Sequence, residues 1–264
     1  MNNIIVLLQK EWLELKQQRS MLLGILALPV MLTLIPLVSF YAVGATPGKT
    51  NVDEFSTQIA RANPALANMN SQELGQSIMG QAFSTMFLLL PMILPSIIAA
   101  YSIVGEKSGR TLEPLLATPI KTWELLTGKM LASLLPSIVL TWICGAIFIG
   151  AVRAFAVSPR VSAAVVSPGW LTVLVVCAPL LALIAIAAMV AISARVNDPR
   201  TAQQWSAWIV VPFLALFFSQ LTGVLVLSPL IAIVAAILLA LIAGLSVWGA
   251  TLLFQREVVL TRWT

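Results

Sequence analysis

Five long runs without a charged residue divide the chain into apolar segments separated by polar ones. The runs cover residues 20–48, 74–105, 130–152, 161–194 and 201–255. A helix of about 20 apolar residues crosses a bilayer. Each of the first four runs is long enough for one such helix, and the fifth is long enough for two. The pattern therefore predicts an all-α, polytopic membrane protein with six transmembrane helices.

The expected helices belong to a single transmembrane domain, residues 1–264. Ser228-Pro229 divides the fifth run most naturally, because proline lacks a backbone donor and disfavours helix in the residue before it. Alternatively, residues 218–232 form a re-entrant pair of short helices, which is allowed where protein buries them. The sequence leaves both arrangements open. The expected spans are residues 21–43, 82–104, 130–152, 170–193, 207–227 and 230–254.

Residues 1–20, before the first span, alternate apolar and charged positions at helical spacing. Ile4, Leu8, Trp12 and Leu15 fall on one stripe, and Lys10 lies largely away from it. A helix with this pattern is typical of the membrane interface, where its apolar side meets the acyl region. We therefore predict an N-terminal amphipathic interfacial helix. The alternative is a simple cytoplasmic extension of the first span.

Two longer connections separate the expected spans. Residues 44–81 are too polar to cross a bilayer and predict an extracytoplasmic segment, either a small folded cap or a solvated loop. Residues 105–129 form a charged loop between the second and third spans. The loop ARVNDPRTAQQ follows the fourth span, and either Asn197 or Asp198 can cap the helix after it.

Charge composition agrees with a membrane protein and orients it. Only 9% of residues are charged, against roughly a quarter in soluble domains, and the mean hydropathy is +0.98. Six spans put both termini on one side, and eleven of the 15 basic residues fall there. By the positive-inside rule, both termini are cytoplasmic in a multi-pass protein of the cell (plasma or inner) membrane. Topology explains the net charge of +5, so no nucleic-acid partner is expected. The terminal side holds Lys10, Lys16, Arg19, Lys107, Arg110, Lys121, Lys129, Arg195, Arg200, Arg256 and Arg262, and the other side holds Lys49, Arg61, Arg153 and Arg160.

Several kinds of chemistry have no candidate residues. The sequence has no histidine and no GxxxxGK[ST] phosphate loop, so we expect no catalytic residue, no metal site and no cofactor in this chain. No predicted span has a charged residue in its middle, which argues against an ion-coupled carrier. Polar span residues either line a path for amphipathic cargo or serve helix packing. These residues include Thr33, Ser84, Thr85, Ser137, Thr141 and Gln220.

The loop GEKSGRTLEPLLATPIKTWELLTGK, residues 105–129, predicts a short helix with an apolar knob. Leu112, Leu115 and Leu116 stand at i, i+3 and i+4, and charged residues surround them. Thr111 is a suitable N-cap, and Thr118-Pro119 ends the helix. An apolar centre with a polar rim is the anatomy of a docking surface. An interfacial helix that only anchors a loop is the alternative.

This loop resembles the signature of ABC-2 type permeases, the membrane subunits of ABC exporters. Their first cytoplasmic loop carries a Gly-Thr-Leu-Glu-x-Leu-Leu-x-Thr-Pro-Ile pattern. The chain departs at Arg110, which replaces the glycine usually found before the threonine, with Gly109 one place earlier. The opening KEWLELKQQRS is similar to the amphipathic connecting helix of that family. The matching residues are Glu106, Gly109, Thr111, Leu112, Glu113, Leu115, Leu116, Thr118, Pro119 and Ile120, followed by Glu124, Leu125, Leu126, Gly128 and Lys129.

The resemblance implies a permease that pairs with a second permease subunit, identical or related, and with cytoplasmic ABC ATPase subunits that bind ATP and Mg. Membrane lipids surround it, and its cargo stays open. A non-transport membrane scaffold or a signalling subunit is the alternative. A second, less specific set of coupling residues is Arg195, Asp198 and Arg200, which equally fit a solvated loop. The ATPase-coupling residues implied by the resemblance are Glu106, Arg110, Thr111, Leu112, Glu113, Leu115, Leu116, Thr118 and Pro119.

Overall fold

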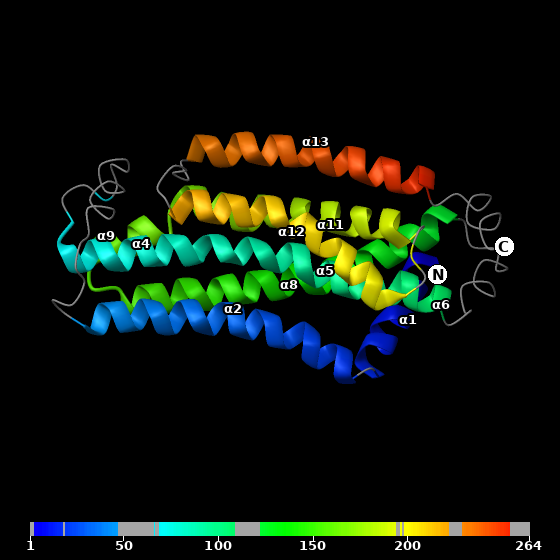
Figure 1. The fold of residues 1–264 in the computed structure, drawn as a ribbon, viewed down its shortest axis with the longest axis horizontal. Coiled ribbons are helices and arrows are strands. Elements are labelled where there is room, and N and C mark those ends of the chain that lie inside the picture. Colours follow the sequence, from blue (N-terminus) through cyan, green and yellow to red (C-terminus); the bar gives the residue numbers. More distant parts are fainter. Residues whose placement is uncertain are drawn as a thin grey trace.

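The computed structural model describes residues 3–17, 19–46, 66, 69–108, 122–193, 196, 198–221 and 229–253. This part of the chain is helical and contains no strand, and its long helices lie side by side along the longest axis (Figure 1). The α-helices are α1 (Asn3–Gln17), α2 (Arg19–Ala45), α4 (Ser71–Met86), α5 (Leu90–Ala99), α6 (Gly105–Ser108), α8 (Thr122–Phe155), α9 (Pro159–Val165), α10 (Pro168–Thr172), α11 (Ala178–Ser193), α12 (Pro199–Leu221) and α13 (Pro229–Leu253). Between them stand the 3-10 turn η2 (Phe87–Leu89) and the π-helical turns η3 (Ala100–Val104) and η4 (Val173–Cys177).

Five helical stretches of the described chain are long and apolar enough to cross a membrane: Leu22–Ala45, Ser71–Val104, Trp123–Phe155, Pro159–Ser193 and Leu230–Thr251. They confirm the prediction of a polytopic all-α membrane protein. The α12 helix is also long and runs lengthwise beside them (Figure 1). On either side of the stretch for which a re-entrant pair was the alternative, α12 ends at Leu221 and α13 begins at Pro229. Residues 222–228 lie outside the described part.

Two helices begin before the predicted spans that they contain. The second helical column begins at Ser71 rather than at residue 82, because Glu73 accepts a hydrogen bond of 2.9 Å from the Asn70 backbone N–H and stabilises the first turn. The first turns of this column are polar, so a count of apolar residues does not detect that the helix begins there. The α8 helix begins at Thr122 rather than at residue 130, so Lys129 lies inside a helix and not in a loop.

The interior is formed by the second and fourth helical columns, Ser71–Val104 and Pro159–Ser193, which are mostly buried. At its centre the Phe87, Phe148 and Trp170 rings are in contact, with the Phe87 and Phe148 centroids 4.9 Å apart. By contrast, α2 and α13 are mostly exposed and apolar. Their outer faces are therefore suited to lipid or to another membrane subunit.

The hydroxyl groups in the spans are used for packing. Ser133, Ser137 and Thr141 are fully buried at successive i+4 positions of α8, and each hydroxyl donates to the carbonyl four residues earlier. Thr33 and Ser84 are also buried and donate to carbonyls of their own helices. These residues therefore do not line an open surface of the chain, and helix packing is the better interpretation. The side chain of Gln220 lies outside the described part.

One buried amide joins three helices at the end of the molecule opposite α1. Gln76 of α4 is fully buried, and its Nε2 donates to the backbone oxygens of Phe40 at 3.2 Å and Phe155 at 3.0 Å. Its Oε1 accepts from the Val157 N–H at 3.0 Å. The buried amide therefore holds the far ends of α2 and α8 against α4.

Five of the six exposed tryptophans in the described chain lie toward the other end, where α1 lies, and the sixth, Trp142, lies farther along α8. The α8 and α12 helices begin at this end, and α13 finishes there (Figure 1). Tryptophan concentrates at the boundary between a bilayer and water. The exposed side chains concerned are Trp12, Trp123, Trp205, Trp208 and Trp248. Their distribution indicates that one membrane interface runs across this end.

Candidate functional site

The candidate site lies where the predicted coupling loop leaves and re-enters the helices. The α6 helix ends at Ser108 and α8 begins at Thr122, and both are at the same end of the molecule as α1 (Figure 1). The α1 helix packs mainly against α8. Side chains from α1, the η3–α6 stretch and α8 therefore meet at this end of the molecule.

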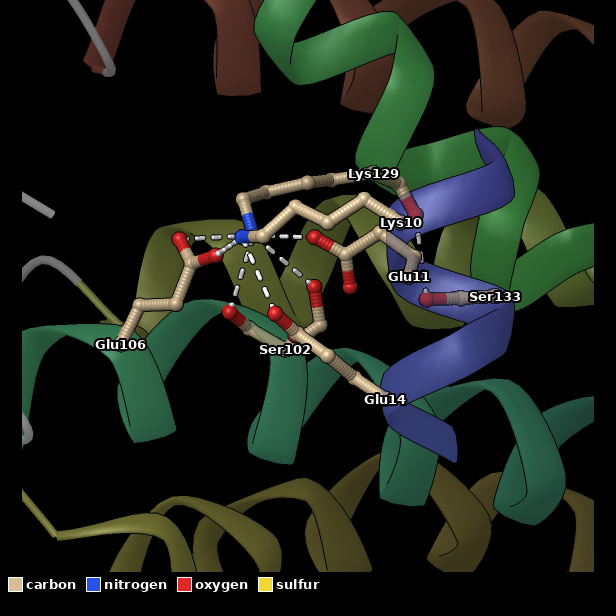
Figure 2. A network of polar contacts seen from close by, with 7 residues as sticks. All are labelled: Lys10, Glu11, Glu14, Ser102, Glu106, Lys129 and Ser133. Atoms are coloured by element: carbon tan, nitrogen blue, oxygen red, sulfur yellow. Dashed lines mark hydrogen bonds and ion pairs between the residues drawn. The ribbon is translucent and has the colours of Figure 1, made fainter. Parts of the chain in front are cut away.

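Lys129 is the centre of a buried ion-pair network. Its Nζ lies 2.7 Å from Glu11 Oε1 and 2.8 Å from Glu106 Oε2, and only 1% of its side chain is exposed. The same Nζ donates to the backbone oxygen of Ser102 at 3.0 Å and to its hydroxyl at 3.1 Å. Figure 2 shows these groups converging on the ammonium group from three segments of the chain. Protein oxygens therefore take the place of water around the buried cation, as a charge in a low-dielectric interior requires.

Lys10 extends the network to the surface. Its Nζ donates to Glu106 Oε1 at 2.6 Å and lies 3.3 Å from Glu14 Oε1, one helical turn away in α1. Glu106 is thus held by two lysines, one on α1 and one on α8. Two ammonium groups and three carboxylates leave the network with a formal charge of about −1 when all are ionised. Each charge has an opposite charge beside it.

The network shifts the acidity of its members. Burial would raise the pKa of Glu106, but Lys129 and Lys10 outweigh that effect and hold the pKa below its ordinary value of 4.5. Burial would likewise lower the pKa of Lys10, but the hydrogen bond that its ammonium donates to Glu106 and the nearby carboxylates raise the pKa above 10.5. Both groups are therefore charged throughout the physiological range of pH.

Local sequence explains why these groups meet. In α1, Leu7 and Glu11 are four residues apart and form the face buried against the rest of the chain. In α8, Gly128 precedes Lys129, and a Cβ on Gly128 would lie 3.1 Å from the Leu7 Cβ. The absence of a side chain at Gly128 therefore lets α1 approach closely enough for Glu11 to reach Lys129. The π-helical turn η3 contains Ser102, and such turns are frequent at functional sites.

The three carboxylates raise the question of a metal site. One oxygen each from Glu11, Glu14 and Glu106 lies within 4.8 Å of the others. The ammonium groups of Lys129 and Lys10 are paired with carboxylate oxygens of these same three residues. The arrangement therefore fits an internal salt-bridge network and not a cation site.

The structure places three of the predicted coupling residues. Glu106 is buried beneath the loop, where it pairs with Lys10 and Lys129. Asp198 caps α12, because its Oδ2 accepts from the Thr201 N–H and hydroxyl, both at 2.9 Å. These bonds lower the pKa of Asp198, and the capping prediction is confirmed for this residue. Arg200 is exposed. Arg110, Thr111, Leu112, Glu113, Leu115, Leu116, Thr118, Pro119 and Arg195 lie outside the described residues.

Sequence reasoning did not find Glu11, Lys10, Ser102 or the role of Lys129. The stripe it identified in α1 contains Leu8 and Trp12, whereas the face buried in the protein contains Leu7 and Glu11. One signal in the sequence pointed to this pair. Lys129 directly precedes an apolar run, so a helix that begins before residue 129 buries its charge, and the charge then needs a counter-ion. Glu11 is a suitable partner, because it stands four residues after Leu7 and so shares an apolar face of α1.

No curated protein matches the chain. A family model described as "ABC-2 family transporter protein" matches residues 5–235, which includes nearly all of α1, the coupling loop and the first turns of the last helix, α13.

Proposed function

Because the chain belongs to the ABC-2 family of transporter proteins, we propose that it is the permease subunit of an export complex whose ATPase is a separate chain. The chain itself is a multi-pass membrane permease component. In the proposed complex, cytoplasmic ABC ATPase subunits bind ATP and Mg and contact the loop at residues 109–121. A second permease subunit, identical or related, completes the translocation pathway.

The observation that supports this proposal best is the ion pair between Glu106 and Lys129. Glu106 stands just before the loop and Lys129 stands just after it, and their charged atoms are 2.8 Å apart. Both are also tied to α1 through Lys10 and Glu11. A displacement of the loop by a partner is therefore passed to α1 and to the second and third spans together, rather than absorbed by a loose connection.

ATP supplies the energy in this account. Nucleotide binding closes the ATPase pair, the coupling loops move with it, and the permease pair changes between inward-facing and outward-facing arrangements. A ligand shifts such an equilibrium only by its difference in affinity for the two states. The ion-pair network contributes because it connects α1, α6 and α8, so that these helices move together with the loop during that change.

Six spans with both termini in the cytoplasm of a plasma or inner membrane complete the proposal. Three observations support this topology. The α1 helix and the end of α13 lie at the same end of the molecule (Figure 1). Eleven of the 15 basic residues fall on that side by sequence. Exposed tryptophans gather there as well.

Affinity purification of the tagged full chain from its native membrane in mild detergent tests the proposal. Mass spectrometry should then find a soluble protein with a phosphate loop in about equal amount, and its retention should increase with a non-hydrolysable ATP analogue. Absence of any ATPase, with and without the analogue, would overturn the exporter account. The chain would then act as a membrane scaffold or a signalling subunit.

A further inference from the structure

The outward side of α1 forms an apolar groove that the ion-pair network does not use. The groove runs between α1 and α8 and has a volume of about 470 Å³, which falls within the size range of small-ligand sites. Five of its lining side chains are apolar, and the polar ones are Gln9 and Lys16. The complete lining is Ile5, Leu8, Gln9, Trp12, Leu13, Lys16 and Leu135.

The lining has an order along the helix. Ile5, Leu8, Trp12 and Lys16 recur at helical spacing, so they follow one face of α1. Leu8 and Trp12 each follow Leu7 and Glu11 by one position. The groove face is therefore rotated about the axis of α1, relative to the face that packs on α8, by the angle between consecutive residues. The apolar side chains therefore fill the length of the groove, and a cation stands at one end of the row.

Lys16 has no counter-ion within the described part of the chain. Its side chain is exposed, and it forms no ion pair with another described residue, in contrast to Lys10 and Lys129. A lysine that ends an apolar row extends its ammonium group toward the polar headgroups while its methylene chain stays in the apolar region. The groove thus offers an apolar channel and one uncompensated positive charge.

We propose that this groove binds one anionic phospholipid of the adjacent leaflet, with an acyl chain in the apolar channel and the phosphate at Lys16. The chain is a membrane protein, so lipid reaches this face from the bilayer. Trp12 is 44% exposed in the lining, at the position where an indole meets the headgroup region. Basic residues on an amphipathic interfacial helix are attracted to anionic lipid. The proposal rests on membrane embedding and does not depend on an ATPase partner.

Native mass spectrometry of the full chain in detergent provides the test. The protein is titrated with phosphatidylglycerol and with phosphatidylcholine of the same acyl chains. We expect the unmodified chain to bind one phosphatidylglycerol about tenfold more tightly than phosphatidylcholine, a difference of about 1.4 kcal/mol. Lys16→Glu should abolish this preference. Leu8→Trp, which fills the channel, should reduce the binding of both lipids.

Arg160→Glu is the matched control, because it makes the same charge change at an exposed position in α9, far from α1. This variant should keep the preference for phosphatidylglycerol. Equal binding of the two lipids by the unmodified chain would overturn the proposal, as would an unchanged preference in Lys16→Glu. Binding of inorganic phosphate that competes with the lipid without an acyl chain would identify a free-anion site and also overturn it. A second copy of the chain occupying the groove would appear as a dimer that Leu8→Trp dissociates, again against the proposal.

Discussion

Lys129 of α8 and Glu11 of α1 form an ion pair of 2.7 Å although 118 positions separate them in the sequence. Both side chains are almost fully buried, and Glu106 shares the same ammonium group. The N-terminal helix is therefore fixed to α8, the helix that follows the predicted coupling loop. The testable consequences concern the stability of this connection, its dependence on pH and the function that depends on it.

Removing the central cation should strongly destabilise the protein. Lys129→Met leaves Glu11 and Glu106 buried without their shared counter-ion, and breaking a buried ion pair in this way costs about 3 to 5 kcal/mol. Thermal unfolding in detergent without added lipid measures the loss. The exposed Lys16 carries the matched control, Lys16→Met, which should have little effect. A Lys129→Met variant as stable as the unmodified chain would contradict this account of the network.

Neutralising the whole network should recover much of that stability. The triple variant Glu11→Gln, Glu106→Gln and Lys129→Met removes the uncompensated carboxylates, because apolar or neutral replacements of buried ion pairs are often tolerated. Its unfolding temperature should lie well above that of Lys129→Met alone. If the triple variant were less stable than the single one, the loss in Lys129→Met would not come from unpaired charge.

Two glycines of α8 should respond in opposite ways to the same substitution. Gly128→Ala places a methyl group 3.1 Å from the Leu7 Cβ and forces α1 away, at a cost of about 1 to 3 kcal/mol. A Cβ at Gly150 has no atom within 4 Å, so Gly150→Ala should gain up to about 1 kcal/mol from helix propensity. Thermal unfolding compares the two variants. Equal shifts of the same sign would show that close packing of α1 does not explain Gly128.

The buried amide at the far end should also contribute to stability. Gln76→Leu keeps the approximate size but removes three hydrogen bonds to backbone groups of residues 40, 155 and 157. Leaving buried backbone groups without this partner should cost about 2 to 3 kcal/mol. Gln72 forms one such bond, to Gly44 O, and Gln72→Leu should cost less. A larger loss in the Gln72 variant would contradict the assignment of Gln76 as the main connection.

The acidic limit of stability should depend on Glu106. Its pKa is held below 4.5 in the folded chain, so its contribution is complete above pH 4.5 and is lost as the pH falls through the lowered value. Thermal unfolding of the unmodified chain should therefore weaken below about pH 4.5, relative to a plateau at neutral pH. Glu106→Gln should be less stable at neutral pH and change less with acid. Parallel pH profiles for the two proteins would contradict this prediction.

Stability at high pH should depend on Lys10, and here stability is lost as the pH rises. The pKa of Lys10 is raised above 10.5, so its contribution is complete below pH 10.5 and is lost as the pH rises through the raised value. In Lys10→Met, the unfolding temperature should no longer decline at alkaline pH, and it should stay constant with pH near neutrality. A decline unchanged in Lys10→Met would assign the alkaline transition to another group.

Charge reversal in the coupling loop should disrupt the complex and not the fold. Glu113→Lys should reduce the amount of ATPase that is purified with the chain, while membrane insertion and the unfolding temperature stay the same. Glu54→Lys makes the same change in the segment expected outside the cytoplasm and serves as the control. Undiminished ATPase in the Glu113 variant would exclude this residue from the contact.

The sequence predicted the features that depend on local pattern. Charge-free runs located the apolar helices, and the two capping candidates, Asn197 and Asp198, included the residue that caps α12. The start of α4 was also readable, because Asn70 and Glu73 have the spacing of a capping box, but the polar composition of residues 44–81 left a folded cap and a solvated loop both open. The resemblance of the coupling loop to ABC-2 permeases agreed with the family match.

The candidate site could not be predicted in the same way, because its contacts are long-range. From composition, Lys129 is the last residue of the charged loop at residues 105–129. In the structure, it lies inside α8 and is buried. Its partner Glu11 lies on a face of α1 that differs by one position from the predicted apolar stripe. Helical spacing identifies neighbours within one helix, whereas the pairing of α1 with α8 depends on Gly128 and on three-dimensional packing.

The central claim is that a separate ATPase contacts the coupling loop of this permease. Site-specific photo-crosslinking in the native membrane tests it most directly, with a photoreactive residue at Leu115 in the loop and a control at Leu230, which is exposed at the opposite end of α13. The account predicts an adduct between the Leu115 position and a protein with a phosphate loop, stronger with bound nucleotide and absent from the Leu230 position. No ATPase adduct at Leu115 in the assembled membrane, or equal adducts at both positions, would contradict it.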